Sequence, residues 1–164
     1  MQIRLASKIT TDSIVDGLGL RMVVWMQGCI HNCPFCHNPQ THALDGGFVT
    51  TVDEVVDYIN SYSFKSGVTI SGGDPFVQKE ALLELVKKIK ESKTNIWVYT
   101  GYDYEQLLAN DLSREILNYI DVLVDGKFIN ELKNDTLRFK GSTNQRIIDV
   151  QQSLKLNKVI ELDI

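Results

Sequence analysis

Short apolar runs rich in β-branched residues alternate with segments of helical periodicity along most of this chain. The alternation predicts an α/β fold with a mostly parallel sheet, because parallel strands need helical crossovers between them. About five or six strands are too few to close an eight-stranded barrel, so we expect an open partial (βα) barrel. The expected strands are Met22–Met26, Val68–Ile70, Ile96–Tyr99 and Val122–Val124, with weaker candidates at Arg146–Val150 and Val159–Leu162. The expected helices are Thr51–Tyr62, Gln78–Glu91, Asp103–Ala109 and Ser113–Tyr119.

The size and composition predict one globular domain over residues 1–164, long enough to bury a substantial core. The formal net charge of −4 argues against a nucleic-acid partner, because phosphate contacts need a basic face. No apolar stretch approaches the roughly 20 residues that span a bilayer, and the N-terminal residues lack the apolar segment of a signal peptide. We therefore expect a cytoplasmic protein that binds neither nucleic acid nor membrane.

Each of the four main strands is followed by a loop with polar, glycine or cysteine residues. These loops read Q-G-C-I-H-N-C-P-F-C (27–36), S-G-G-D-P (71–75), T-G-Y (100–102) and D-G-K (125–127). In a parallel sheet the carboxyl ends of the strands lie at one edge, where function gathers. The sequence therefore predicts one site at that edge.

All three cysteines of the chain, Cys29, Cys33 and Cys36, lie in the first of these loops. In a reducing compartment, clustered cysteines suggest metal binding or catalysis rather than disulfides. The C-x3-C-x2-C spacing lets one loop supply three thiolates to a [4Fe–4S] cluster and leaves one iron open. Two alternatives remain, namely three buried structural cysteines and a Cys3His zinc site. The candidate fourth zinc ligands are His31, His37 and His42.

The stretch C-I-H-N-C-P-F-C, from Cys29 to Cys36, resembles the cysteine signature of the radical S-adenosylmethionine superfamily. The stretch S-G-G-D-P is similar to the glycine-rich motif of the same superfamily. The resemblance implies that the cysteines hold a [4Fe–4S] cluster whose open iron binds the amino and carboxylate groups of S-adenosylmethionine. It also implies that the second motif receives the methionine amino group, and paired glycines permit a close backbone approach to a ligand. The residues of this motif are Ser71, Gly72, Gly73 and Asp74.

Further stretches resemble the activating enzymes of glycyl-radical enzymes, and most of all those that act on anaerobic (class III) ribonucleoside-triphosphate reductase. D-G-L-G-L-R (16–21) is similar to their D-G-P-G-x-R run, with Leu18 in place of proline. C-H-N-P (36–39) matches the sequence after their third cysteine. K-G-S-T-N-Q-R (140–146) resembles their R-G-S-x-N-Q-R element, with Lys140 in place of arginine.

The same resemblance assigns roles to residues outside the cysteine loop. D-G-K fits a D-x-K element, in which Asp125 lies near a monovalent cation or the cofactor and Lys127 pairs with the methionine carboxylate. Thr100 is expected nearby, and Phe35 is expected against the adenine unless it packs the loop onto the core. An ordinary D-G turn with a solvated lysine is the alternative for D-G-K. Arg146 either reaches the site or lies on the surface.

The implied activity is reductive cleavage of S-adenosylmethionine to methionine and a 5′-deoxyadenosyl radical, which removes a Cα hydrogen from one glycine of the anaerobic reductase. The resemblance also implies flavodoxin or a similar low-potential protein as electron donor. The protein itself supplies chelation, orientation and exclusion of side reactions. Two alternatives remain. One is a radical S-adenosylmethionine enzyme with a small-molecule substrate, similar to 7-carboxy-7-deazaguanine synthase, against which K-G-S-T-N-Q-R speaks. The other is a non-catalytic zinc-binding interaction module.

Overall fold

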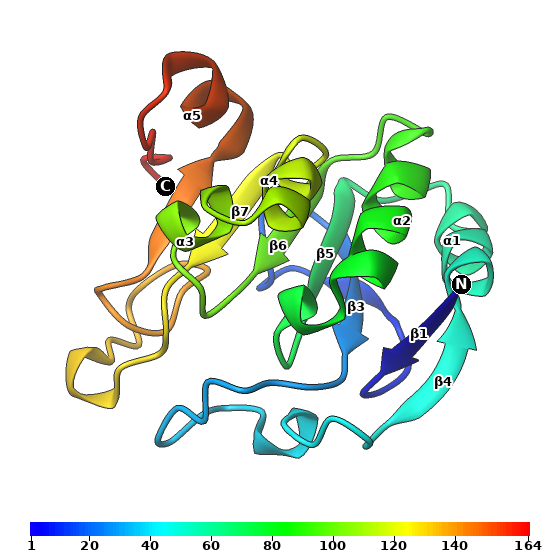
Figure 1. Cartoon of the computed structure of the whole chain (residues 1–164), viewed down its shortest axis with the longest axis horizontal. Helices are drawn as coiled ribbons and strands as arrows, with labels where there is room; N and C mark the ends of the chain where they lie inside the picture. Colours follow the sequence, from blue (N-terminus) through cyan, green and yellow to red (C-terminus); the bar gives the residue numbers. More distant parts are fainter.

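One mixed sheet of eight strands runs through the computed structural model, which describes residues 1–164 (Figure 1). The strand order is β4-β1-β3-β5-β6-β7-β8, and β2 pairs with β3 outside this path. The strands are β1 (Gln2–Leu5), β2 (Thr10–Ser13), β3 (Arg21–Met26), β4 (Phe48–Thr51), β5 (Gly67–Gly72), β6 (Ile96–Tyr99), β7 (Val122–Asp125) and β8 (Arg146–Asp149). The helices are α1 (Val52–Asn60), α2 (Lys79–Lys90), α3 (Tyr104–Leu108), α4 (Asp111–Leu117) and α5 (Val150–Leu156), with short 3-10 helices η1 (Pro39–Thr41), η2 (Pro75–Gln78) and η3 (Asn130–Leu132).

The centre of the sheet is parallel and both flanks are antiparallel. β3, β5, β6 and β7 pair in parallel, whereas β1, β2, β4 and β8 enter only antiparallel pairings. The prediction of a mostly parallel sheet of five or six strands is therefore wrong for the flanks. The flanking strands β1, β2 and β4 have four residues each, and sequences such as T-T-D-S lack the apolar run of a buried strand. The expected strand Val159–Leu162 is reduced to an isolated bridge between Ile148 and Glu161.

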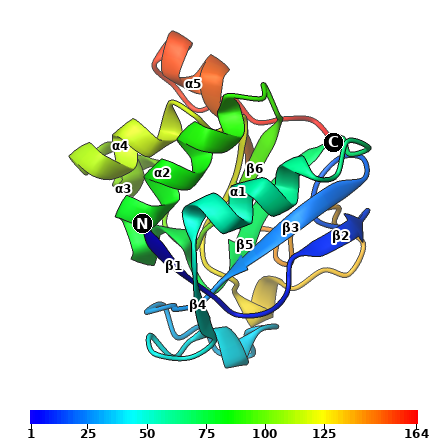
Figure 2. The same cartoon turned by 90° about the vertical axis from the view of Figure 1, so that its right-hand side faces the viewer.

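The two faces of the sheet are covered differently. Along β6, Ile96 and Val98 are buried in the main core, which also includes apolar residues of α1, α2 and α4, while Trp97 belongs to a smaller cluster. Successive side chains of a strand point to opposite faces, so the smaller cluster marks the second face. Figure 2 shows α1 and α2 on one side of β3 and β5, with the short strand β2 beside β3. Because β4 and β8 do not pair, the sheet stays open.

Local sequence explains where the first helix begins. Thr51 caps α1 by accepting a hydrogen bond from the backbone nitrogen of Glu54 at 3.1 Å. Asp53 and Glu54 add negative charge to the first turn, where the helix dipole favours it. No helix has the length and apolar character to cross a membrane.

Candidate functional site

Four loops meet at one edge of the sheet, the lower edge in Figure 1. They follow the carboxyl ends of β3, β5, β6 and β7, whose parallel register aligns those ends. The loops carry the cysteines, G-G-D-P, T-G-Y and D-G-K, respectively. The structure thus places together the four loops that the sequence singles out.

The cysteine loop carries three free, half-buried thiols. Its first cysteine is fixed at the base of the loop, where the Cys29 nitrogen donates to the His42 carbonyl at 3.1 Å. Burial is the main cause that raises the pKa of the Cys29 and Cys33 thiols. At Cys33 a backbone hydrogen bond from Phe128 and the Lys127 ammonium lower the pKa. The ring of Phe128 also packs against His37, so the D-G-K loop lies beside the cysteine loop.

The donor set of this loop fits an iron–sulfur cluster better than a closed zinc site. Three thiolates on one loop are the ligands that such clusters use. No group of three His, Cys, Asp or Glu side chains is arranged around a common point in this structure, so the assignment of the cysteines as cluster ligands rests on the donor set.

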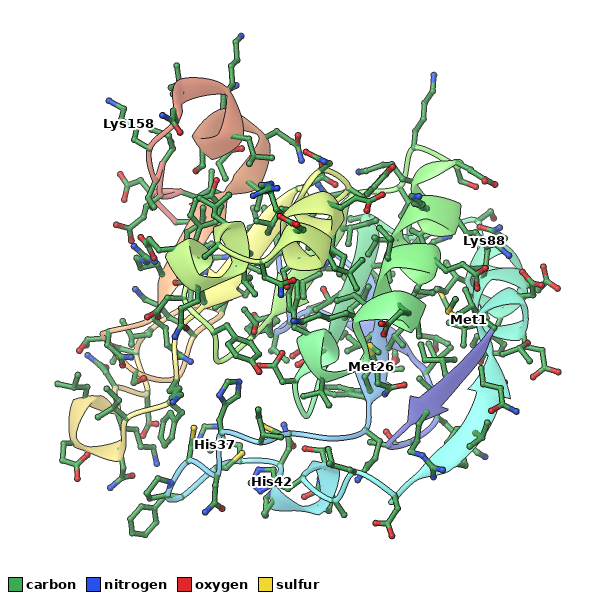
Figure 3. The ribbon with its side chains drawn as sticks, viewed as in Figure 1. Met1, Met26, His37, His42, Lys88 and Lys158 are labelled. Carbon is green, nitrogen blue, oxygen red and sulfur yellow. The ribbon has the colours of Figure 1, made fainter.

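Two of the three histidines make contacts that draw them away from a zinc site. His31 is bonded to Asp74, and the ring of His37 packs against Phe128 with centroids 4.9 Å apart. The Nε2 atom of His42 is buried without a hydrogen-bond partner. Figure 3 shows His37 and His42 on the loop below Met26.

Gly72 and Gly73 let the end of β5 lie directly against the start of the cysteine loop. A Cβ at Gly73 would lie 2.2 Å from the Gly28 carbonyl oxygen, and one at Gly72 would lie 2.3 Å from the Met26 carbonyl oxygen. The contact is sealed by a 2.7 Å hydrogen bond from the Asp74 nitrogen to the Gly28 carbonyl. The sequence reading assigned these glycines to the approach of a ligand. The structure shows that they serve the approach of two loops, and the ligand contact stays a prediction.

The buried carboxylate of Asp74 joins three of the four loops. It accepts hydrogen bonds from the Gly101 nitrogen at 2.9 Å and from the Phe76 nitrogen at 3.0 Å, and its Oδ2 lies 2.5 Å from His31 Nε2. The Thr100 hydroxyl lies 3.0 and 2.9 Å from its two oxygens. Asp74 and Thr100 are thus occupied by protein groups. The sequence did not predict these contacts of Asp74, because His31 was considered only as a metal ligand.

Asp125 pairs with Arg146, and the expectation that Asp125 lies near a monovalent cation or the cofactor stays a prediction. Its carboxylate receives two hydrogen bonds from Arg146, at 3.1 and 2.5 Å, and one from the Tyr104 nitrogen at 2.8 Å. Arg146 also binds Glu105 through two nitrogens, at 3.0 and 2.7 Å, so it braces the loops rather than extending alone into solvent.

Lys127, two residues beyond Asp125, is exposed and pairs with no carboxylate. The next residue, Phe128, packs against His37, so Lys127 lies on a loop adjacent to the cysteine loop. This placement leaves Lys127 able to meet an anionic group of a bound molecule.

A cavity of about 600 Å³ opens beside the cysteine loop. This volume lies within the range of about 300–1,000 Å³ typical of small-molecule sites. Phe35, adjacent to the cavity residue Cys36, is 74% exposed, which excludes the alternative that it packs the loop onto the core. Its contact with adenine stays a prediction. The cavity is lined by Cys36 and His37, by Trp25, Ser71 and Tyr99 of the sheet, and by the segment 137–141.

Asp16, the first residue of the D-G-L-G-L-R loop, lines the cavity together with Ile14 and Val15, and the buried Arg21 holds this loop. The Arg21 guanidinium donates to the Leu18 carbonyl at 3.0 Å and to the Thr69 hydroxyl at 2.9 Å. Thr69 in turn donates to the Asp16 carbonyl at 2.5 Å. The turn therefore keeps its shape through Arg21, although Leu18 replaces the rigid proline.

Comparisons with known proteins give a consistent family. The model of the 4Fe-4S single cluster domain matches residues 15–148. The anaerobic ribonucleoside-triphosphate reductase-activating protein of Escherichia coli K12 is 36% identical over 140 residues, covering 80% of this chain and 90% of the relative. The protein of the same name from Vibrio cholerae is 37% identical over 142 residues, covering 82% and 90%. That of enterobacteria phage T4 is 36% identical over 140 residues, covering 81% and 86%.

The crystal structure of QueE from Escherichia coli has a TM-score of 0.49 and 17% identity, covering 62% of this chain and 53% of that chain. This likeness is too weak to bear on activity. The family match rests instead on the cluster-domain model and on relatives that align over most of their own length. The chain belongs to the family of anaerobic ribonucleoside-triphosphate reductase-activating proteins.

Proposed function

We propose that this chain generates a glycyl radical on an anaerobic ribonucleoside-triphosphate reductase, using a [4Fe–4S] cluster held by Cys29, Cys33 and Cys36 together with S-adenosylmethionine. The observation that carries the proposal is the cavity of about 600 Å³ lined both by Cys36 and by Ser71, next to G-G-D-P. The names of relatives at about 36% identity support the same activity. When bound, the cluster and S-adenosylmethionine supply a radical able to remove a hydrogen atom from a glycine.

The chain's own residues would bind and orient the cofactor. Lys127 would pair with the methionine carboxylate, which its exposure and its place beside Cys33 support. The backbone of Ser71, Gly72 and Gly73 would receive the methionine amino group, and Phe35 would cover the adenine. Asp74, Thr100 and Asp125 would act by holding the loops in place, since their side chains are bonded to protein groups.

The proposal also covers the domain organisation, the electron donor and a cation near the site. Residues 1–164 would act as one domain, since a single sheet includes strands from both ends of the chain. The electron would come from flavodoxin or a similar low-potential protein in the cytoplasm. A monovalent cation near Asp125 would lie beside the ion pair that Asp125 forms with Arg146.

The test is anaerobic reconstitution with iron and sulfide, followed by addition of dithionite and S-adenosylmethionine. The protein should turn brown and release 5′-deoxyadenosine. Addition of the reductase encoded beside it should give a glycyl-radical doublet in the electron paramagnetic resonance spectrum. Cys33→Ala should abolish both results, whereas Ile30→Ala, in the same loop and exposed, should leave them unchanged.

The outcomes separate the alternatives. A colourless protein that binds zinc and no iron would favour the interaction module. Release of 5′-deoxyadenosine without a glycyl radical would remove the reductase as substrate and favour a small-molecule radical enzyme. Cleavage that persists in Cys33→Ala would show that the ligand assignment is wrong.

A further inference from the structure

The antiparallel register of β7 and β8 continues beyond the ends of the two strands. Within the strands Asp125 lies opposite Arg146, and the two side chains form an ion pair with a 2.5 Å contact. The next residue, Gly126, has φ of +96°, a conformation that ends the regular strand. From this point the backbone ladder stops, and other groups must bond the carbonyls of the departing loop.

Beyond the end of the backbone ladder, the hydrogen bonds come from the side chains of Asn144 and Gln145, the two residues that precede β8. The Gln145 side-chain nitrogen donates to the Gly126 carbonyl at 3.0 Å. The Asn144 side-chain nitrogen donates to the Lys127 carbonyl at 2.8 Å. Together with Arg146, the run N-Q-R therefore bonds the run D-G-K residue for residue.

This clamp is itself held in shape. The Gln145 side-chain oxygen accepts hydrogen bonds from the Gly141 nitrogen at 2.8 Å and the Ser142 nitrogen at 3.2 Å. The fully buried Ser142 then accepts a hydrogen bond from the Ile129 nitrogen at 3.2 Å through its hydroxyl. The K-G-S-T-N-Q-R turn thus fixes the D-G-K loop on both sides of Lys127.

The clamped loop leads directly to the cysteines. Phe128, the residue after Lys127, packs against His37, which follows Cys36. The Lys127 side chain itself forms no ion pair, so its ammonium is free for an incoming anion. Loss of the clamp would let this ammonium move relative to the cysteine loop without removing any thiol.

We propose that Asn144, Gln145 and Arg146 are positioning residues that hold Lys127 at the place where it receives the carboxylate of S-adenosylmethionine. This inference rests on the proposed function and assigns a role to the K-G-S-T-N-Q-R element. None of the three residues needs to touch the cofactor. Their effect passes through the D-G-K backbone.

The first measurement is the affinity of the reconstituted protein for S-adenosylmethionine. Binding is detected as a change in the electron paramagnetic resonance spectrum of the reduced cluster. Asn144→Ala should weaken binding about five-fold, which corresponds to about one hydrogen bond, with iron content unchanged. Thr143→Ala is the matched control, because Thr143 is next to Asn144 and its side chain is also exposed. Equal affinity in Asn144→Ala and Thr143→Ala would overturn the proposal.

A double-mutant cycle asks whether Asn144 acts through Lys127. In the Lys127→Ala background, Asn144→Ala should cause little further loss, since the group that it positions is gone. A full additional loss would overturn the proposal while leaving the proposed function intact. A wild-type protein that binds no S-adenosylmethionine would overturn the proposed function, and the clamp's role in binding with it.

Amide hydrogen exchange of the protein without its cluster gives a second readout. Exchange at residues 125–129 should be faster in Asn144→Ala than in Thr143→Ala, because the carbonyl of Lys127 loses its partner. Unchanged exchange would show that the side chain does not hold the loop, and would overturn the clamp.

Discussion

The Nε2 atom of His31 lies 2.5 Å from Oδ2 of Asp74, and this contact joins the cysteine loop to the G-G-D-P loop. Both side chains are almost completely shielded from water, at 6% and 0% exposure. Low local dielectric strengthens such a hydrogen bond and makes the loss of either partner costly. His31 stands between Cys29 and Cys33, so the contact fixes the part of the loop that must present two thiols.

His31→Ala should lower the affinity of the loop for the cluster by about ten-fold, as is typical when a residue that orients metal ligands is removed. The measurement is iron and sulfide bound per chain after anaerobic reconstitution at limiting iron. Ile30→Ala provides the control, since Ile30 is exposed and directly precedes His31 in the same loop. Equal iron content in the two variants would show that the contact does not support the cysteine loop.

Asp74→Asn should destabilise the protein without its cluster by about 1–3 kcal/mol, because an amide nitrogen cannot accept the hydrogen bonds that one oxygen now accepts. Urea unfolding by circular dichroism measures the change. Asp135→Asn, at a side chain that is 88% exposed, should leave stability unchanged. If Asp74 served only a bound cofactor, the two variants would be equally stable in the absence of that cofactor.

How much of the fold and the site can be predicted from the sequence depends on whether the contacts that determine each element are local in the chain. β3, β5, β6 and β7 were predictable because buried strands need apolar runs, whereas β1, β2 and β4 gain their pairing from neighbours that no local pattern specifies. The meeting of four loops followed from parallel topology alone. The partners of Asp125 did not, because Arg146 lies opposite it only through the antiparallel return of β8.

Arg21→Lys should destabilise the fold by about 2–4 kcal/mol, since one ammonium cannot satisfy the carbonyls that a guanidinium now bonds. Arg21 is buried next to Trp97, and its side chain bonds Leu18, Val68 and Asn95. Burial lowers its pKa to about 10. Urea unfolding against Arg114→Lys, a half-exposed surface position, measures the effect. Equal stability of the two variants would contradict a structural role for Arg21.

The ion pair of Glu105 with Arg146 should make part of the stability depend on pH. The hydrogen bond from Arg146 lowers the pKa of Glu105 below its ordinary value of 4.5. A carboxylate with a lowered folded pKa contributes stability above its unfolded pKa and loses it as pH falls through the folded value. Glu105→Gln should therefore cost less than about 1 kcal/mol at pH 7, because the Glu105 side chain is 58% exposed and water screens the interaction.

The difference between wild type and Glu105→Gln should shrink as the pH is lowered below 4.5 and Glu105 becomes protonated. Thermal unfolding of the cluster-free protein at a series of pH values measures this difference. Glu131→Gln is the control, since Glu131 is exposed and forms no ion pair with Arg146 or with any other basic residue. A Glu105→Gln difference that stays constant or grows toward acid pH would contradict the pairing, because a protonated Glu105 no longer gains from the neighbouring guanidinium.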